Sequence, residues 1–155
     1  MTAVLQRVKK ATVRVDGNTV GACEAGLMIL LGVRQGDTEE DSRLLAEKIA
    51  RLRIFEDEAG KMNLSVLDIG GSALVVSNFT LAADYSHGNR PSFIEAARPE
   101  VAEPLYLDFA ARLRALVGRV ECGEFGADMK IEMTADGPVT IVMESDKLRK
   151  GKHGA

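Results

Sequence analysis

The stretch LMILLGV at residues 27–33 decides how the rest of the chain is interpreted. This apolar run is too short for a buried helix, so it predicts a central strand, and SALVVSNF at 72–79 predicts a second one. A helix is predicted between them, because Asp37 can cap its start and Glu40, three residues later, completes the capping-box pattern. The apolar face of that helix consists of Leu45, Ile49 and Leu52.

Shorter patterns on both sides of this core predict further strands. Residues 3–8 and 11–15 are predicted strands, and a hairpin turn at 16–18 leads to a return strand at 19–23. Near the other end of the chain, strands are predicted at about 128–134 and 138–144.

A second helix is predicted from about Glu100 to Val117, followed by Gly118 as a suitable helix end. Its buried stripe consists of Leu105, Phe109, Leu113 and Leu116. Pro104 fits only if it lies in the first turn, where few backbone donors are committed. The predicted fold class is therefore α+β: a mostly antiparallel sheet or open barrel that two main helices cover.

The length of 155 residues favours one domain, which we place at residues 1–145. Residues 146–155 form a basic tail with Lys147, Arg149, Lys150 and Lys152 against Asp146. This tail is predicted to be disordered, and either remains solvated or contacts RNA phosphates. No stretch approaches 18 apolar residues and the start does not resemble a signal peptide, so neither a membrane span nor export is predicted and the expected location is the cytoplasm.

The chemical inventory excludes several kinds of active site. The chain has two histidines, His87 and His153, and two distant cysteines, Cys23 and Cys122, so no zinc site, other metal or cofactor is predicted. The cysteines are interpreted as small core residues. The net charge of −3 disfavours a broad coat for nucleic acid, and no DNA partner is predicted. Any enzyme built on this chain works with little acid–base help from side chains.

Three polar segments interrupt the apolar pattern, and each has a plain structural interpretation beside a functional one. SNFTL at 77–81 ends a buried strand, where backbone N–H groups become free, or is simply a capped strand end. HGNRPSF at 87–93 is a loop that is either functional or an ordinary surface turn. DGPVT at 136–140 places a proline between two strands, where an ordinary trans-proline loop is the plain interpretation.

Six short motifs in order resemble the D-aminoacyl-tRNA deacylase family. They are LQRV at 5–8, GKMN at 60–63, SNFTL at 77–81, GNRPSF at 88–93, FGADM at 125–129 and DGPVT at 136–140, and the match covers essentially residues 1–144. The resemblance implies a barrel-like α+β homodimer with active sites at the subunit interface. It also implies hydrolysis of the ester that joins a D-amino acid to the 3′-terminal adenosine of tRNA, and no membrane partner.

The resemblance also implies roles for particular residues. Ser77, Asn78, Phe79 and Thr80 line the reaction centre, Gly137 and Pro138 form a Gly-cis-Pro pair that reaches into the partner subunit, Arg7 holds that pair, and Phe125 and Met129 pack near the terminal adenine. One departure is notable, since Asn78 stands where the family usually has Gln. Asn keeps the amide but shortens the side chain by one methylene, so the change is mild if only the backbone N–H at this position matters.

The expected mechanism follows from the reactivity of an aminoacyl ester. Backbone N–H groups of residues 78–80 are expected to stabilise the oxyanion, and the resemblance implies that the 2′-OH of the terminal ribose assists the attacking water. A covalent route through Thr80 or Ser77 is the rival, although the nearby sequence offers no activating base. The Gly-Pro pair rejects L-aminoacyl groups by steric clash, which leaves glycyl-tRNA as a further substrate.

Two other functions remain open from the residues alone. The basic tail and the lack of a catalytic side-chain set fit an RNA-binding module without catalytic activity. A hydrolase of small esters with a Ser or Thr nucleophile is the other alternative.

Overall fold

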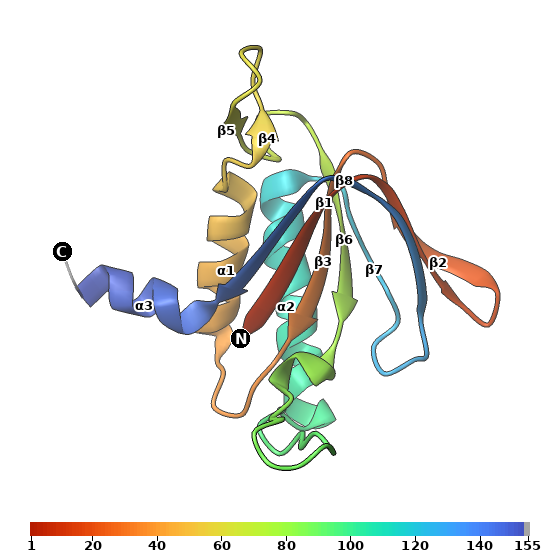
Figure 1. Cartoon of the computed structure of the whole chain (residues 1–155), viewed down its shortest axis with the longest axis vertical. Coiled ribbons are helices and arrows are strands. Elements are labelled where there is room, and N and C mark those ends of the chain that lie inside the picture. The colour runs from red at the N-terminus through yellow and green to blue at the C-terminus, as the bar shows by residue number, and fades with distance from the viewer. Residues whose placement is uncertain (154–155) are drawn as a thin grey trace.

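A curled, mixed sheet forms the centre of the molecule in the computed structural model, which describes residues 1–153. Its strands are β1 (Thr2–Val15), β2 (Asn18–Cys23), β3 (Gly26–Gly32), β6 (Ser72–Ser77), β7 (Val120–Cys122) and β8 (Lys130–Glu144). The order is β2-β1-β3-β6-β7, and β8 pairs with the other edge of β1 (Figure 1).

The predicted mostly antiparallel sheet is correct around β1 and wrong beyond β3. β1 pairs antiparallel with β2, β3 and β8, whereas the β3–β6 and β6–β7 pairs are parallel. The reason lies in the connections, because a helix between two strands of one sheet returns the chain to the same end and makes the strands parallel. β3 and β6 therefore end at the same edge of the sheet.

Two pairs of predicted strands are in fact single long strands. The segments at 3–8 and 11–15 merge into β1, and those at 128–134 and 138–144 merge into β8. Pro138 is tolerated inside β8 because this strand lies at the edge of the sheet, where a missing N–H breaks no ladder on the open side. The pairing of β1 with β8 shifts register between Gln6 and Val8, opposite the Gly-Pro pair.

The helices α1 (Glu39–Arg51) and α2 (Pro99–Val117) are where the sequence predicts them, but two details differ. Thr38 and Asp41 form the capping box of α1, not Asp37 and Glu40, because the Asp37 carboxylate instead accepts from the Arg34 N–H at 2.7 Å. Pro104 lies inside α2 beyond its first turn, so α2 forgoes one backbone hydrogen bond there.

The helices cover one face of the sheet and create the main core (Figure 1). This core joins both helices to the central strands through Leu5, Leu27, Ile29, Leu31, Leu45, Ile49, Val75, Tyr106, Phe109 and Leu113. A smaller core on the opposite face is enclosed where the sheet curls, and contains Val8, Val13, Met28, Leu74 and Val76. Because both faces of β3 and β6 are buried, these strands read as continuous apolar runs.

The basic tail is not the disordered segment that its composition predicts, since Ser145–His153 forms helix α3. Two contacts hold its first turns: Leu148 packs against the main core, and the Arg149 guanidinium pairs with the Asp41 carboxylate. The Ser145 hydroxyl also donates to Asp41 at 2.7 Å. These partners are remote in sequence, so composition alone predicted the opposite.

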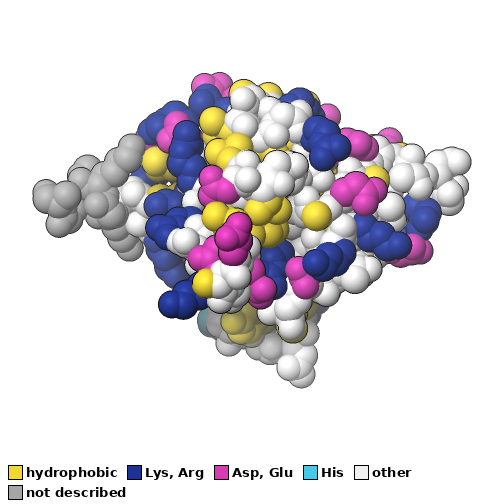
Figure 2. Space-filling view, turned by 90° about the horizontal axis from the view of Figure 1, so that it is seen from above, with side chains coloured by type: hydrophobic (Ala, Val, Ile, Leu, Met, Phe, Trp, Pro, Cys, Tyr) yellow, Lys and Arg dark blue, Asp and Glu magenta, His cyan; other side chains and the backbone are white. Residues whose placement is uncertain are grey.

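The remaining elements project from the ends of the sheet. A hairpin of β4 (Phe55–Glu56) and β5 (Met62–Leu64) lies at one end, and the short 3₁₀ helix η1 (Phe79–Ala82) at the other. Figure 2, which looks onto the hairpin end, shows basic and acidic side chains interspersed and no large surface of one sign. Within residues 1–153, no helix combines the length and apolar character that crossing a membrane needs.

Candidate active site

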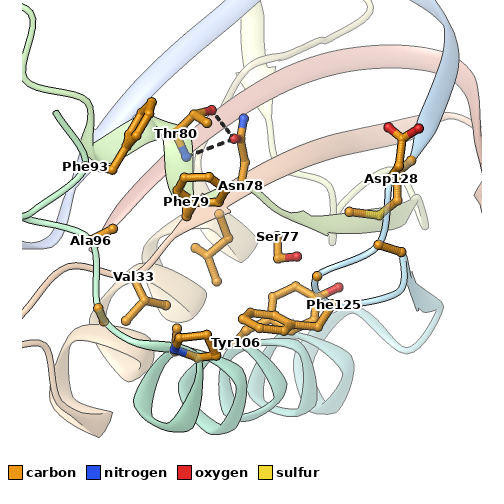
Figure 3. A pocket seen from close by; sticks show the side chains of 17 residues that line it. Val33, Ser77, Asn78, Phe79, Thr80, Phe93, Ala96, Tyr106, Phe125 and Asp128 are labelled. Carbon is orange, nitrogen blue, oxygen red and sulfur yellow. Dashed lines mark hydrogen bonds between the residues drawn. The ribbon is translucent and has the colours of Figure 1, made fainter. Parts of the chain in front are cut away.

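A cleft of about 700 Å³ opens where β3 and β6 end, between η1, the start of α2 and the segment that precedes β8 (Figure 3). Its predicted lining residues are Ser77, Asn78, Phe79, Thr80, Phe125 and Met129, all of which border it. The structure therefore brings together two motifs almost fifty positions apart. The carboxyl edge of parallel strands is the usual place for a site in sheets of this kind.

The turn that follows β6 is held from two directions. The Asn78 N–H donates to the carbonyl oxygen of Leu31 at 2.8 Å, which ties the turn to the end of β3. The Asn78 side-chain oxygen accepts from the Thr80 N–H at 3.2 Å and from the Thr80 hydroxyl, so it caps η1 (Figure 3). A side chain at Gly32 would meet Asn78 O and Leu81 Cβ at 3.0 Å, so glycine permits this close approach.

These hydrogen bonds leave one main-chain donor at the centre of the motif. Of the N–H groups at 78–80, that of Asn78 is bonded to Leu31 and that of Thr80 to the Asn78 side chain. The Phe79 N–H has no hydrogen-bond partner among the residues that the structure describes. A free N–H at the rim of an apolar cleft is suited to binding a developing oxyanion.

Aromatic rings form two walls of the cleft. Phe79 and Phe93 pack edge to face with their ring centroids 5.2 Å apart, and Tyr106 and Phe125 lie 5.8 Å apart at the base (Figure 3). The Tyr106 hydroxyl donates to the Val75 carbonyl at 2.9 Å, and burial raises the pKa of its phenol, so Tyr106 stays neutral. Flat apolar walls of this size suit a nucleobase or another planar group.

Sequence reasoning gave no role to Phe93 or Tyr106. Phe93 stands in the GNRPSF motif, which carried no assigned chemistry. Tyr106 lies three positions before Phe109, and this helical spacing is the signal that would have added Tyr106 to the buried stripe.

The cleft contains no histidine and no cysteine, and Asp128 is its only carboxylate. Asp128 lies at the exposed rim, where the Lys130 ammonium pairs with it at 3.1 Å. His87 does not border the cleft, and its Nδ1 contacts the neighbouring Ser86 hydroxyl at 2.7 Å. Within residues 1–153, no three His, Cys, Asp or Glu side chains gather as metal ligands.

Cys23 and Cys122 are both free thiols and do not form a disulfide with each other. Cys23 is buried in the smaller core, and burial raises the pKa of its thiol to about 11, so it is an unreactive apolar side chain at neutral pH. Cys122 is half-buried against the main core.

Gly137 and Pro138 lie outside this cleft, on the exposed edge strand β8, and the peptide bond between them is cis. Arg7, only 5% exposed, supports them from beneath. Its Nε donates to the Asp136 carbonyl at 3.2 Å, and its Nη1 donates to the Ile54 carbonyl at 2.8 Å. One chain therefore holds two separate features: the 77–80 cleft, and the Gly-Pro pair with its buried arginine.

Comparisons with known proteins agree with the motifs. A family profile described as D-Tyr-tRNA(Tyr) deacylase matches residues 4–144. The D-aminoacyl-tRNA deacylase of Chloroflexus aurantiacus is 60% identical over 149 residues, which cover 96% of this chain and 93% of that protein. The D-aminoacyl-tRNA deacylase of Halalkalibacterium halodurans is 57% identical over 145 residues, which cover 94% of this chain and 99% of that protein.

Solved structures agree in fold. The c-Myc DNA unwinding element binding protein superposes with a TM-score of 0.87 at 41% identity, covering 93% of this chain and 98% of that one. A probable eukaryotic D-amino acid tRNA deacylase superposes with a TM-score of 0.80 at 18% identity and shows the shared fold alone. The family expected from the motifs is confirmed. Since the profile spans nearly the whole chain and both curated relatives are more than half identical to it, the chain belongs to the D-Tyr-tRNA(Tyr) deacylase family.

Proposed function

We propose that this protein hydrolyses the ester of D-aminoacyl-tRNA and releases the free D-amino acid and the tRNA. One observation carries the proposal: among the described residues, a cleft with aromatic walls presents the free Phe79 N–H, is lined by no histidine, and has its one carboxylate, Asp128, paired with Lys130 at the rim. Such a site suits a substrate that is already activated and brings its own hydroxyl. The names of its relatives support the same substrate. Because aminoacyl-tRNA is used in translation, the proposed location is the cytoplasm.

The terminal adenosine occupies the apolar part of the cleft. We place its base against Phe125 and Met129, beside the ring of Tyr106. The ester carbonyl then faces η1, where the Phe79 N–H donates to the oxyanion of the tetrahedral intermediate. One such donor typically lowers the barrier by about 2.7–4 kcal/mol.

Water attacks the ester directly, with help from the 2′-OH of the terminal ribose. The Thr80 hydroxyl is a poor nucleophile because it donates to the Asn78 amide oxygen, which is not a base. Ser77 lines the cleft, and no hydrogen bond joins its hydroxyl to a histidine or a carboxylate among the described residues. Loss of turnover on a 2′-deoxy substrate supports the direct route, and a trapped acyl-enzyme on Thr80 or Ser77 overturns it.

Selection against L-amino acids comes from a second copy of the chain. Gly137 and Pro138 are exposed and outside their own cleft, so they act in the cleft of a partner in a homodimer. Their carbonyl groups form a wall beside the substrate α-carbon, and proline has no N–H to donate. A D side chain points away from this wall, an L side chain collides with it, and glycine has nothing to exclude.

The deciding experiment compares three substrates: D-aminoacyl-tRNA, the matching L-aminoacyl-tRNA, and a simple ester of the same D-amino acid. Of these three, we expect rapid hydrolysis of D-aminoacyl-tRNA only. Glycyl-tRNA, tested separately, should also be hydrolysed. Equal cleavage of the simple ester favours a small-ester hydrolase with a Ser or Thr nucleophile. Binding of all tRNAs without any hydrolysis favours an RNA-binding module and refutes the proposal.

A further inference from the structure

We propose that the loop at residues 84–94 binds the single-stranded nucleotides that precede the terminal adenosine of the tRNA. This inference rests on the proposed function, because the loop borders the same cleft and would extend its binding surface beyond Phe93. The loop contains the whole GNRPSF motif, most of which has no assigned role in the chemistry of the cleft. It leaves the cleft after η1 and returns to it at Phe93.

The loop is held in a defined shape. Asp84 and Ser92 pair across its base through two backbone hydrogen bonds of 2.8 Å each. The Asp84 carboxylate accepts from the Ser86 hydroxyl at 2.6 Å and from the Ser86 N–H at 3.0 Å, and these bonds lower the pKa of Asp84. A loop that is already ordered loses little conformational freedom when it binds a ligand.

Apolar side chains on this loop face solvent. Tyr85 is 82% exposed and Ile94 is 79% exposed, and the aromatic ring pairs of the described chain do not include Tyr85. Phe93 belongs to the cleft wall beside Phe79, and the backbone pairing of Asp84 with Ser92 holds the chain segments next to Tyr85 and Phe93 side by side. The stacking surface of the cleft therefore continues outward onto the loop, where a ring can stack on a base of any sequence.

A positive charge on the loop also favours binding of the RNA phosphate backbone on this side of the cleft. Arg90 is exposed and has no ion pair among the residues that the structure describes. Of the two acidic neighbours, Glu95 is paired with the Arg34 guanidinium at 3.3 Å, and Asp84 is a charged group at the base of the loop, where Ser86 donates to it. Across the cleft, Asp128 is paired with the Lys130 ammonium at 3.1 Å, so the cation at that rim is already matched by a carboxylate (Figure 3).

The chemistry of the loop fits a short RNA strand better than a protein surface. Aromatic rings next to a free cation are the usual means of binding single strands without sequence readout. A second protein copy needs a broader apolar area, and here the exposed apolar side chains stand among Gly, Asn and Ser. The occupant is therefore the pair of nucleotides that leads into the terminal adenosine.

The test measures kcat/KM on two substrates that differ only in length, a D-aminoacyl ester of adenosine and one of the trinucleotide CCA. We expect the wild type to prefer the trinucleotide by about tenfold or more, and Tyr85→Ala to lose about tenfold of that preference while cleaving the adenosine ester normally. Arg90→Ala weakens the trinucleotide reaction and reduces the slope of log kcat/KM against log salt by about 0.7. Lys61→Ala, on the β4–β5 hairpin at the other end of the molecule, is the matched control and changes neither.

The possible results separate the two proposals. If the wild type cleaves both esters with equal efficiency, or if Tyr85→Ala and Arg90→Ala affect both equally, the loop does not bind the preceding nucleotides. If these variants shift the oligomeric state in sedimentation, the loop is a protein interface and the inference is wrong. If the wild type cleaves neither ester nor D-aminoacyl-tRNA, the proposed function itself fails.

Discussion

Asn78 shows how one side chain organises the turn that forms the proposed reaction centre. Its amide oxygen accepts hydrogen bonds from the N–H and the hydroxyl of Thr80, and its own N–H donates to Leu31. Of the N–H groups at 78–80, the Phe79 N–H is the one without a partner among the described residues. The cap requires a side-chain acceptor that reaches the Thr80 N–H, and the Asn78 amide oxygen reaches it at 3.2 Å. Asn suits this position because its short side chain supplies the acceptor from within its own turn.

Two substitutions at residue 78 separate its two effects. Asn78→Ala removes the cap, so we expect a loss of about 1 kcal/mol in the free energy of unfolding together with a fall in kcat. Asn78→Asp keeps an acceptor and the stability but places a negative charge beside the developing oxyanion, so only kcat falls. Chemical denaturation and single-turnover kinetics measure the two quantities. Full activity of Asn78→Asp would contradict an oxyanion at Phe79.

Gly32 sets the distance between β3 and the turn of residues 78–81. A Cβ at this position would lie 3.0 Å from Asn78 O and Leu81 Cβ, so Gly32→Ala pushes η1 outward by a few tenths of an ångström. We expect a clear fall in kcat, up to about 100-fold, with a smaller effect on stability, because catalysis is more sensitive to position than folding is. Gly60→Ala, in the distant hairpin at a positive φ, is the control and lowers stability without changing kcat.

At the scale of elements, the Asp41 carboxylate is the polar contact that joins helix α1 to helix α3, through Ser145 and Arg149. Burial alone raises the pKa of Asp41, but hydrogen bonds from the Thr38 N–H and the Ser145 hydroxyl, with the positive charges of the N-terminal amine and Arg149, bring it below its usual value. A carboxyl with a lowered pKa stabilises the fold above its unfolded-state pKa and loses that effect as the pH falls below it.

The stability of α3 should therefore depend on pH in the acid range. We expect the free energy of unfolding to fall as the pH drops below about 4, and Asp41→Asn to show a shallower fall from a lower starting value. Denaturant titrations between pH 2 and pH 7 measure both slopes. Identical pH profiles for the wild type and the variant would show that Asp41 does not provide this link.

At the scale of the whole molecule, the open edge of β8 is the surface along which we propose that a second copy binds. This long strand pairs with β1 alone, and it exposes 42% of Met133 and 63% of Val142. Unpaired edges with exposed apolar side chains favour association between copies. The same strand carries Gly137 and Pro138, so dimerisation along β8 and delivery of the Gly-Pro pair are parts of one proposal.

Breaking this edge should affect assembly and selectivity together. We expect Val142→Lys to yield a monomer by sedimentation and to lose most activity toward D-aminoacyl-tRNA. Pro138→Ala should remain dimeric and raise cleavage of L-aminoacyl-tRNA relative to the D form. An unchanged D-to-L ratio in Pro138→Ala counts against the wall.

Mixed dimers test whether the Gly-Pro pair acts across the interface. A cleft variant, Asn78→Asp, supplies an intact Gly-Pro pair, and Pro138→Ala supplies an intact cleft. Exchange between the two should restore D-selective hydrolysis in one of the two sites of each mixed dimer. Absence of any restoration, with subunit exchange verified, would place the Gly-Pro pair in its own cleft.

The amino-acid sequence by itself determined the features that depend on neighbouring residues. The apolar runs at 27–33 and 72–79, the stripes of the two main helices and the six family motifs are all local patterns, and local patterns are set by burial and backbone preference. The predicted set of residues around the reaction centre follows from the same motifs, because each motif stays together in the fold.

Tertiary structure decided every feature that depends on a distant partner. Asp37 is not the cap of α1 because the N-terminal amine also donates to it at 2.8 Å, and the tail forms α3 because it meets Asp41. Only the folded chain shows that the Asn78 N–H donates to the Leu31 carbonyl and that Gly137 and Pro138 lie away from their own cleft. A buried backbone group or charge pairs with whichever partner the fold brings within hydrogen-bonding distance, and the spacing of residues along the sequence does not predict that partner.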